Sequence, residues 1–224
     1  MSAIAIVGAG PGLGASLGRV FGSQGFDVAL ISRSKTNLDA LAAGLIAKGV
    51  TAEGFAADVA DTASLTAALE AVATRFGRID VLEFSPYAGL IQVNPADVTP
   101  GNLRPVIEEL LYGAVTATQA VLPAMLEAGS GTLLYTTGGG AITPYPFLAT
   151  LNAAQAALRN WVRNLHNTLA ERGVYAGTVA VNAMIAASAP AGIPAIAPDD
   201  LAQAYWNLHI RRDHAEIVLP AGGR

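Results

Sequence analysis

The opening stretch of this chain constrains its fold more than any other. An apolar run at residues 3–7 is followed by a turn that reads GAGPGLG from Gly8 to Gly14. Residues 15–24 then carry apolar side chains at helical spacing, and residues 28–31 form a second apolar run. This order predicts a buried strand, a glycine turn, a helix and another strand, which is the first half of a nucleotide-binding βαβ unit.

The glycines of this turn have a physical role in such a unit. Gly8, Gly12 and Gly14 let the backbone approach a pyrophosphate and let the helix start tight against the strand. Phosphates accept hydrogen bonds from the free N–H groups at the positive end of the helix dipole. We therefore expect Gly8, Gly12, Leu13 and Gly14 to contact a dinucleotide. The alternative is a turn without a ligand.

Composition excludes several other classes of protein. The chain has 224 residues, 52% of them hydrophobic, and no linker or repeat divides it, so we expect one domain over residues 1–224. A net charge of −4 without a basic run gives nucleic-acid binding no electrostatic support. The absence of cysteine excludes disulfides, and three scattered histidines do not make a zinc site, so we expect no metal.

Apolar runs alternate with helical stretches along the rest of the chain. Further strands are expected at residues 51–57, 79–84, 131–137, 174–181 and 216–219, and helices at 36–48, 62–76, 101–128, 147–171 and 199–211. Pro105 is expected to kink the helix at 101–128. The alternation predicts a single doubly wound (Rossmann) parallel sheet with helices on both faces. Ligands bind such sheets beyond the carboxyl ends of the strands.

The uncharged stretch at residues 174–198 is long enough to suggest a membrane span. Pro190, Pro194 and Pro198 interrupt it, so we expect a buried strand followed by an apolar surface loop. No basic residues precede the first apolar run, which argues against a signal peptide. We expect a cytoplasmic protein without membrane contact.

The end of the second strand indicates which dinucleotide binds. NAD sites have a carboxylate there, but this strand ends at Ser32 and Arg33, with Arg33 19 positions after Gly14. A guanidinium can bind a 2′-phosphate with two hydrogen bonds and stack on adenine, which favours NADP(H) over NAD(H). The alternative is a solvated surface arginine. Asp58, after the third strand, is placed to meet adenine or to cap the next helix.

With these residues in view, the chain resembles the short-chain dehydrogenase/reductase family over essentially its whole length. The opening turn meets the family's Gly-x-x-x-Gly-x-Gly pattern, and Asp58-Val59 resembles its adenine-contacting pair. Residues 119–123 resemble the end of the family's fifth helix, and residues 131–137 the strand leading to its catalytic serine. The resemblance implies a nicotinamide cofactor and association through two long helices into a homodimer or homotetramer, here with small residues such as Gly113, Ala117 and Ala120 at the contact.

The chemical motifs of that family are altered in this chain. The usual Asn-Asn-Ala-Gly after the fourth strand is replaced by EFSPYAG at residues 83–89, and the Pro-Gly after the sixth strand is missing. The asparagine of the fifth helix falls at Leu110, and the tyrosine and lysine of Tyr-x-x-x-Lys fall at Leu151 and Gln155. Leucine cannot donate a proton, and a neutral glutamine cannot tune a phenol, although its amide can bond a ribose hydroxyl.

The resemblance also assigns roles to individual residues. Thr137 is at or beside the catalytic serine position and is expected to polarise a carbonyl, while Tyr145 is the best remaining proton donor and Tyr87 the second. The expected cofactor contacts beyond the opening turn are Ser32, Arg33, Asp58, Val59, Ser85, Pro86, Gln155 and Ile185. For both tyrosines, the alternative is simple packing around the pocket.

Three functions stay open on the sequence. The first is an atypical NADP(H)-dependent oxidoreductase that reduces a ketone, quinone or enone of an apolar small molecule. The second is a catalytically inactive NADP(H)-binding protein that acts as a sensor or assembly partner. The third is a scaffold that binds nothing, against which the intact Gly8–Gly14 turn argues. The sequence favours the first.

Overall fold

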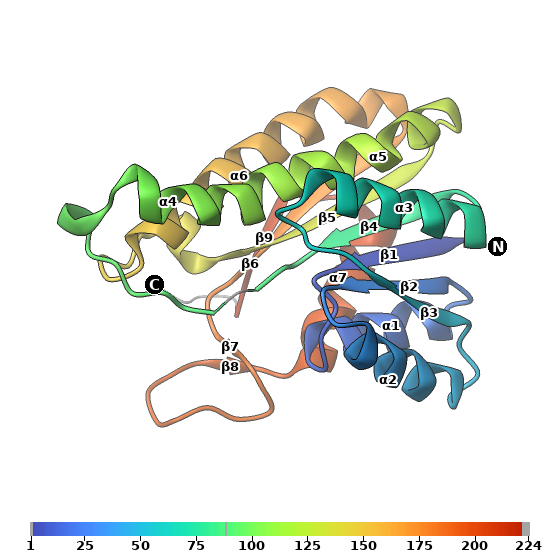
Figure 1. Cartoon of the computed structure of the whole chain (residues 1–224), viewed down its shortest axis with the longest axis horizontal. Coiled ribbons are helices and arrows are strands. Elements are labelled where there is room, and N and C mark those ends of the chain that lie inside the picture. The colour runs from blue at the N-terminus through green and yellow to red at the C-terminus, as the bar shows by residue number, and fades with distance from the viewer. Residues whose placement is uncertain (1, 88, 221–224) are drawn as a thin grey trace.

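A computed structural model describes residues 2–87 and 89–220 of the chain (Figure 1). The main strands are β1 (Ala3–Val7), β2 (Asp27–Ser32), β3 (Ala52–Ala56), β4 (Ile79–Phe84), β5 (Gly131–Gly138), β6 (Val174–Val181) and β9 (Glu216–Leu219). The helices are α1 (Leu13–Ser23), α2 (Lys35–Ile46), α3 (Thr62–Phe76), α4 (Pro100–Ile107), α5 (Gly113–Glu127), α6 (Ala149–Leu169) and α7 (Pro198–Arg211).

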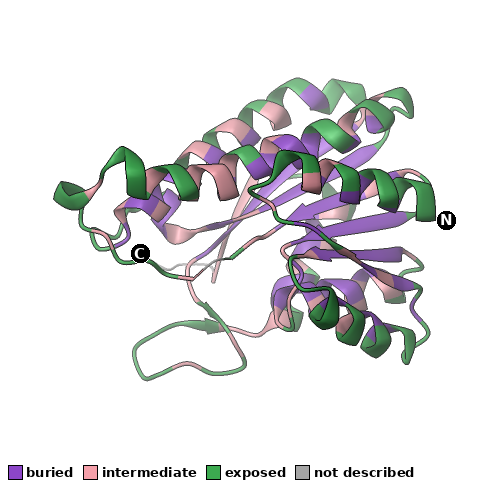
Figure 2. Ribbon diagram, in the orientation of Figure 1, coloured by how far each residue is buried: buried purple, intermediate pink, exposed green. Residues whose placement is uncertain are grey.

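The seven strands form a parallel sheet in the order β3-β2-β1-β4-β5-β6-β9. Helices cover both faces: α3, α5 and α6 pack on one, and α1, α2 and α7 pack on the other (Figure 1). Each face has its own apolar core, and the strands between them are buried along most of their length (Figure 2). The predicted doubly wound sheet is confirmed.

Local chemistry explains where several helices begin. The Asp61 carboxylate caps α3 by accepting a hydrogen bond from the Ser64 N–H at 3.0 Å. Thr99 and Asn102 form a reciprocal capping box at the start of α4. A cap at each of these positions satisfies N–H groups that a helix end leaves unpaired.

The helix expected at residues 101–128 is instead three segments. Helix α4 contains Pro105, a π-helical turn (η2) spans Glu108–Tyr112, and α5 follows. A proline inside a helix removes one backbone hydrogen bond, and the wider turn of η2 begins three residues after Pro105. The expected helical stretch is therefore present, and the irregularity expected near Pro105 includes a π-helical turn.

Two further expectations need correction. The apolar loop after β6 contains a short parallel pair, β7 (Met184–Ile185) with β8 (Ala195–Ile196), in a segment that projects away from the main sheet (Figure 1). Gly113 and Ala117 are buried against the sheet, so only Ala120 of the small residues named for α5 reaches the surface. Nowhere in residues 2–87 and 89–220 is a helix both long and apolar enough to span a bilayer.

Candidate functional site

The strand order of the sheet reverses between β1 and β4, and the chain segments that follow these two strands meet there. The Ser85 N–H donates to the Val7 carbonyl at 2.9 Å. Gly8 has φ of +93°, and a Cβ at this position would lie 2.5 Å from the Pro86 nitrogen. Only glycine meets both conditions, and the crevice at such a reversal is where doubly wound sheets bind ligands.

The rest of the glycine turn is open on its outer side. An added Cβ at Gly10 or Gly12 would meet no atom of the described residues within 4 Å, whereas one at Gly14 would lie 2.8 Å from Ala9 Cα. Gly12 is the N-cap of α1 and supplies no capping side chain. The turn thus combines close helix–strand packing at Gly14 with open space beside Gly10 and Gly12 at the start of α1, and the N–H groups at a helix start suit a pyrophosphate.

The expected adenine side of this crevice lies at the ends of β2 and β3. Arg33 follows Ser32 and is exposed to solvent. Asp58 Oδ1 accepts from the Ala60 N–H at 3.0 Å, so this carboxylate shapes a turn and does not cap α3. The Val59 carbonyl oxygen lies 2.9 Å from the position that a Cβ would take on Gly113, so the segment after β3 packs closely against the start of α5.

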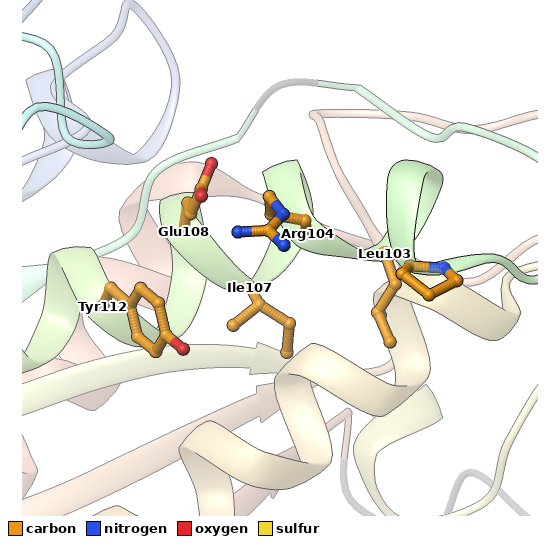
Figure 3. Close-up of a pocket in the computed structure, with 6 residues that line it drawn as sticks. Leu103, Arg104, Ile107, Glu108 and Tyr112 are labelled. Atoms are coloured by element: carbon orange, nitrogen blue, oxygen red, sulfur yellow. The ribbon is translucent and has the colours of Figure 1, made fainter.

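Two cavities lie near this edge of the sheet, on opposite sides of the α4–η2 segment. The larger, about 240 Å³, is lined by α4 and η2 residues and includes Glu108 and Tyr112 (Figure 3). The smaller, about 50 Å³, lies between the loop after β4, η2 and α6. We take the smaller one as the candidate site because it borders the ends of the strands. It is lined by Pro86, Tyr87, Gly89, Ile91, Val106, Glu109, Leu110, Thr150, Leu151 and Gln155.

Helix α6 supplies one wall of this pocket. Leu151 and Gln155 line it, one helical turn apart, and the buried Leu110 faces them from η2. Gln155 Oε1 accepts a hydrogen bond from the Gly138 N–H at 3.0 Å. This bond fixes the orientation of the amide and leaves its NH₂ group available for a ligand.

Thr137 lies at the end of β5 next to this bond, but its side chain is not at the pocket surface. The residue is 1% exposed, and its hydroxyl has no hydrogen-bond partner within the described part of the chain. Buried polar atoms are rarely left unpaired, so this hydroxyl is available to a partner that the protein itself does not supply.

Tyr145 is tied into the protein by both its ends. Its hydroxyl donates to Asn182 Oδ1 at 2.5 Å, and its backbone carbonyl accepts from Asn152 Nδ2 at 2.7 Å. The hydroxyl proton expected to serve a substrate is therefore engaged by a side chain at the end of β6.

Ile185, another residue expected to contact the cofactor, lies on the projecting β7 strand and is 37% exposed.

The sequence analysis missed Glu83, which is fully buried near the end of β4. Its carboxyl accepts from the Ser85 hydroxyl at 2.9 Å and from the Thr136 hydroxyl at 3.0 Å. Burial raises the pKa of Glu83 to about 8, although both hydrogen bonds oppose the rise. An acid between the apolar residues Leu82 and Phe84, inside the expected strand IDVLEF, was the available signal.

Glu109 was also missed, because nothing in the sequence marks the π-helical turn that carries it. It lines the pocket and is half-buried. Burial raises the pKa of its carboxyl, the positive charge of Arg33 opposes the rise, and the negative charge of Asp58 adds to it. Glu109 therefore stands between the expected adenine side and the α6 wall. Among the described residues, no cluster of His, Asp or Glu side chains forms a metal site.

Comparisons with known proteins agree with this geometry. Residues 2–189 match the family model described as short chain dehydrogenase. The chain is 37% identical over 130 residues to D-threitol dehydrogenase of Mycolicibacterium smegmatis, which covers 58% of this chain but only 49% of that protein. It is 27% identical over 226 aligned positions to a fatty acyl-CoA reductase of Mycobacterium tuberculosis, which covers 97% of this chain and 76% of that protein.

Solved structures share the fold. A metagenomic short-chain oxidoreductase crystallised in complex with NADP superposes with a TM-score of 0.85 at 24% identity. The superposition covers 97% of this chain and 95% of that one. At this identity the likeness supports the fold, and the chemistry has to be argued from the residues of this chain.

Proposed function

Since the chain belongs to the short chain dehydrogenase family, we propose that it is an NADP(H)-dependent oxidoreductase that reduces the carbonyl group of an apolar small molecule. The observation that carries the proposal is the open glycine turn beside a pocket with an apolar wall, at one edge of the sheet. In this proposal the reaction proceeds without the family's usual Tyr-x-x-x-Lys pair, since Leu151 and Gln155 occupy the wall.

The residues at this edge fit a bound dinucleotide. Gly12 leaves open space at the start of α1, where the backbone of Gly12, Leu13 and Gly14 would hold the pyrophosphate, and Ser85 and Pro86 would border the nicotinamide ribose. The free NH₂ of Gln155 is available to the same ribose. When bound, the nicotinamide supplies a hydride to the substrate carbonyl carbon.

The preference for the phosphorylated cofactor rests on Arg33. Its guanidinium is exposed at the end of β2, beside a strand end that carries no acid. A carboxylate there would repel the 2′-phosphate, whereas a guanidinium forms charge-assisted bonds to it.

The preference for an apolar substrate rests on the loops around the pocket. Exposed large hydrophobic side chains gather in the loops that follow β4, β5 and β6, namely Tyr87, Leu90, Ile91, Ile142, Tyr145, Phe147, Met184, Ile185 and Ile193. Exposed apolar groups around a site indicate an apolar ligand. The similarity to a fatty acyl-CoA reductase supports the same choice.

The unpaired hydroxyl of Thr137 is the group that we propose polarises the carbonyl. Thr137 is 1% exposed, so this role requires that its hydroxyl become accessible to a bound substrate. Tyr145 is the candidate proton donor from the sequence. An unchanged rate in Tyr145→Phe would remove that tyrosine from the mechanism.

The test is consumption of NADPH against a panel of apolar ketones, quinones and enones, followed by absorbance. Turnover of at least one compound supports the proposal. Tight NADPH binding without turnover of any compound would contradict it.

A second function, a non-catalytic NADP(H) sensor or assembly partner, is favoured by one specific observation. The hydroxyls of Thr137 and Tyr145 are closed off or engaged, while the glycine turn is open. Binding without turnover is the result that it predicts. Homo-oligomers through α5 and α6 stay a prediction for either function, and sedimentation in solution tests it.

A further inference from the structure

The pocket that the proposed function uses has one acidic side chain on its wall. Leu110 and Leu151 present hydrocarbon to it, and Gln155 presents a neutral amide. Glu109 presents a carboxyl group. Tyr87 also lines the pocket, but it is 71% exposed, whereas Glu109 is half-buried. Glu109 is therefore the better shielded from bulk water of the two, which favours it as the group that transfers a proton inside the pocket.

Glu109 lies on the π-helical turn η2 next to a second glutamate, Glu108. Glu108 lines the larger cavity together with Arg104 (Figure 3), whereas Glu109 lines the smaller pocket. Single π-helical turns inside α-helices occur frequently at functional sites. The structure thus supplies two adjacent glutamates, only one of which faces the candidate site.

The surroundings of Glu109 favour its protonated form. Burial raises the pKa of its carboxyl and Asp58 adds to the rise, while Arg33 alone opposes it. The α6 residues that share its pocket, Thr150, Leu151 and Gln155, carry no charge. Tyr87 is the remaining titratable group on the wall. A raised pKa increases the share of this carboxyl group that carries a proton, and only the protonated form can donate one.

We propose that Glu109 is the proton donor of the reduction, in place of the family's tyrosine; this inference rests on the proposed function. As the carbonyl carbon accepts a hydride from the bound nicotinamide, the C=O π bond breaks and its electron pair stays on oxygen. The Glu109 O–H donates its proton to that oxygen, a new O–H bond forms, and Glu109 is left as a carboxylate. Water at the half-exposed side chain returns the proton.

The charge of Arg33 couples this donor to the cofactor. Free Arg33 opposes protonation of Glu109. A 2′-phosphate bound to Arg33 neutralises that charge, so NADP⁺ raises the pKa of Glu109 further, whereas NAD⁺ lacks the phosphate and changes it less. Coupling is reciprocal, so protonation of Glu109 also tightens NADP⁺ binding.

The kinetic test compares Glu109→Gln with Glu108→Gln, a matched control on the same turn. Glu109→Gln is expected to lower kcat roughly 10²–10⁴-fold and to abolish the fall of kcat with rising pH. NADPH affinity at neutral pH stays within a few-fold, and Glu108→Gln stays at the wild-type rate. Glu109→Asp, which keeps the acid, recovers part of the rate and shows that the site is still folded.

A second measurement does not depend on turnover. Carbon-13 labelling of glutamate carboxyl groups, with Glu109→Gln used to assign the signal, follows the Glu109 pKa by NMR. The pKa is expected above the usual range and higher with NADP⁺ than with NAD⁺. An ordinary pKa, or a wild-type kcat in Glu109→Gln while the wild type turns over, would overturn the donor and leave the reductase proposal standing. No turnover by the wild type would overturn the reductase proposal itself.

Discussion

The glycine turn after β1 and the pocket wall on α6 lie at the same edge of the sheet, but they are built differently. The glycine turn is formed by backbone atoms, with Gly8 packed on Pro86 and open space beside Gly12. The pocket wall is formed by side chains, with hydrocarbon from Leu151 and an amide from Gln155. A backbone site keeps its N–H groups whatever its neighbours become, whereas one substitution changes the chemistry of a side-chain site. Binding a dinucleotide and reacting with it are therefore separable properties of this edge.

The largest effect is expected in the turn. Gly8→Ala brings a Cβ to 2.5 Å from the Pro86 nitrogen at a φ of +93°. Overpacking and the left-handed backbone together cost ~3 kcal/mol or more, so the variant should unfold at lower urea concentration or fail to fold. Gly12→Ala meets no described protein atom within 4 Å, so its main loss should be in NADPH affinity. Equal stability of the two variants would contradict this picture of the turn.

Glu83, near the end of β4, is expected to make the free energy of unfolding depend on pH. Burial raises the pKa of Glu83 to about 8 in the folded protein, from an ordinary value of 4.5 for glutamate. Between these values the unfolded chain loses the proton that the folded chain keeps, so stability falls as pH rises, by about 1.4 kcal/mol per unit at most. Glu83→Gln can accept one of the two hydrogen bonds through its oxygen and donate to the other hydroxyl through its NH₂, and it should flatten the slope. Urea unfolding from pH 5 to 8 measures this, and identical slopes would show that Glu83 ionises normally.

Thr137→Val tests the proposed chemistry at the end of β5, beside the pocket, and leaves the glycine turn unchanged. The Thr137 hydroxyl has no partner among the described residues, so removing it should leave thermal stability unchanged or slightly raised. If the hydroxyl polarises the substrate carbonyl, kcat should fall about 10²-fold while NADPH affinity holds. Steady-state kinetics and a melting curve separate the two effects. Lower stability at an unchanged kcat would assign Thr137 to packing alone.

The smallest effect is expected at the rim of the turn. Arg33→Ala removes the charge proposed to bind the 2′-phosphate and should weaken NADPH binding about 10- to 100-fold, with NADH affinity little changed. Lys35→Ala is a matched control because Lys35 is paired with Asp39 on α2. If Arg33→Ala weakened NADPH and NADH binding equally, Arg33 would not be the residue that binds the 2′-phosphate.

The sequence predicted the fold because burial of a strand or helix face produces a regular spacing of apolar residues. The strand at Ala3–Val7 is apolar at every position and is buried at every position. This spacing could not reveal η2, because one wider turn inside a long helix hardly changes the positions of its apolar residues. The small strands β7 and β8 were missed for a related reason, since two-residue strands carry no period.

The site was predictable only where backbone makes it. The close backbone packing at Gly8 and Gly14 was predictable, because close approach demands glycine, whereas their contact with a cofactor stays a prediction. The directions of Glu109 and Tyr145 depend on a helix distortion and on a partner, Asn182, that lies 37 residues away in the chain. Such long-range orientation has no local signature. Arg33 stays a prediction until a cofactor is bound.

The most direct test is a fluorescence titration of the wild-type protein with NADPH and, separately, with NADH. The account predicts saturable binding of both to the glycine turn, with NADPH at least about tenfold tighter. Failure to bind either nucleotide, or equal affinity for the two, would contradict it.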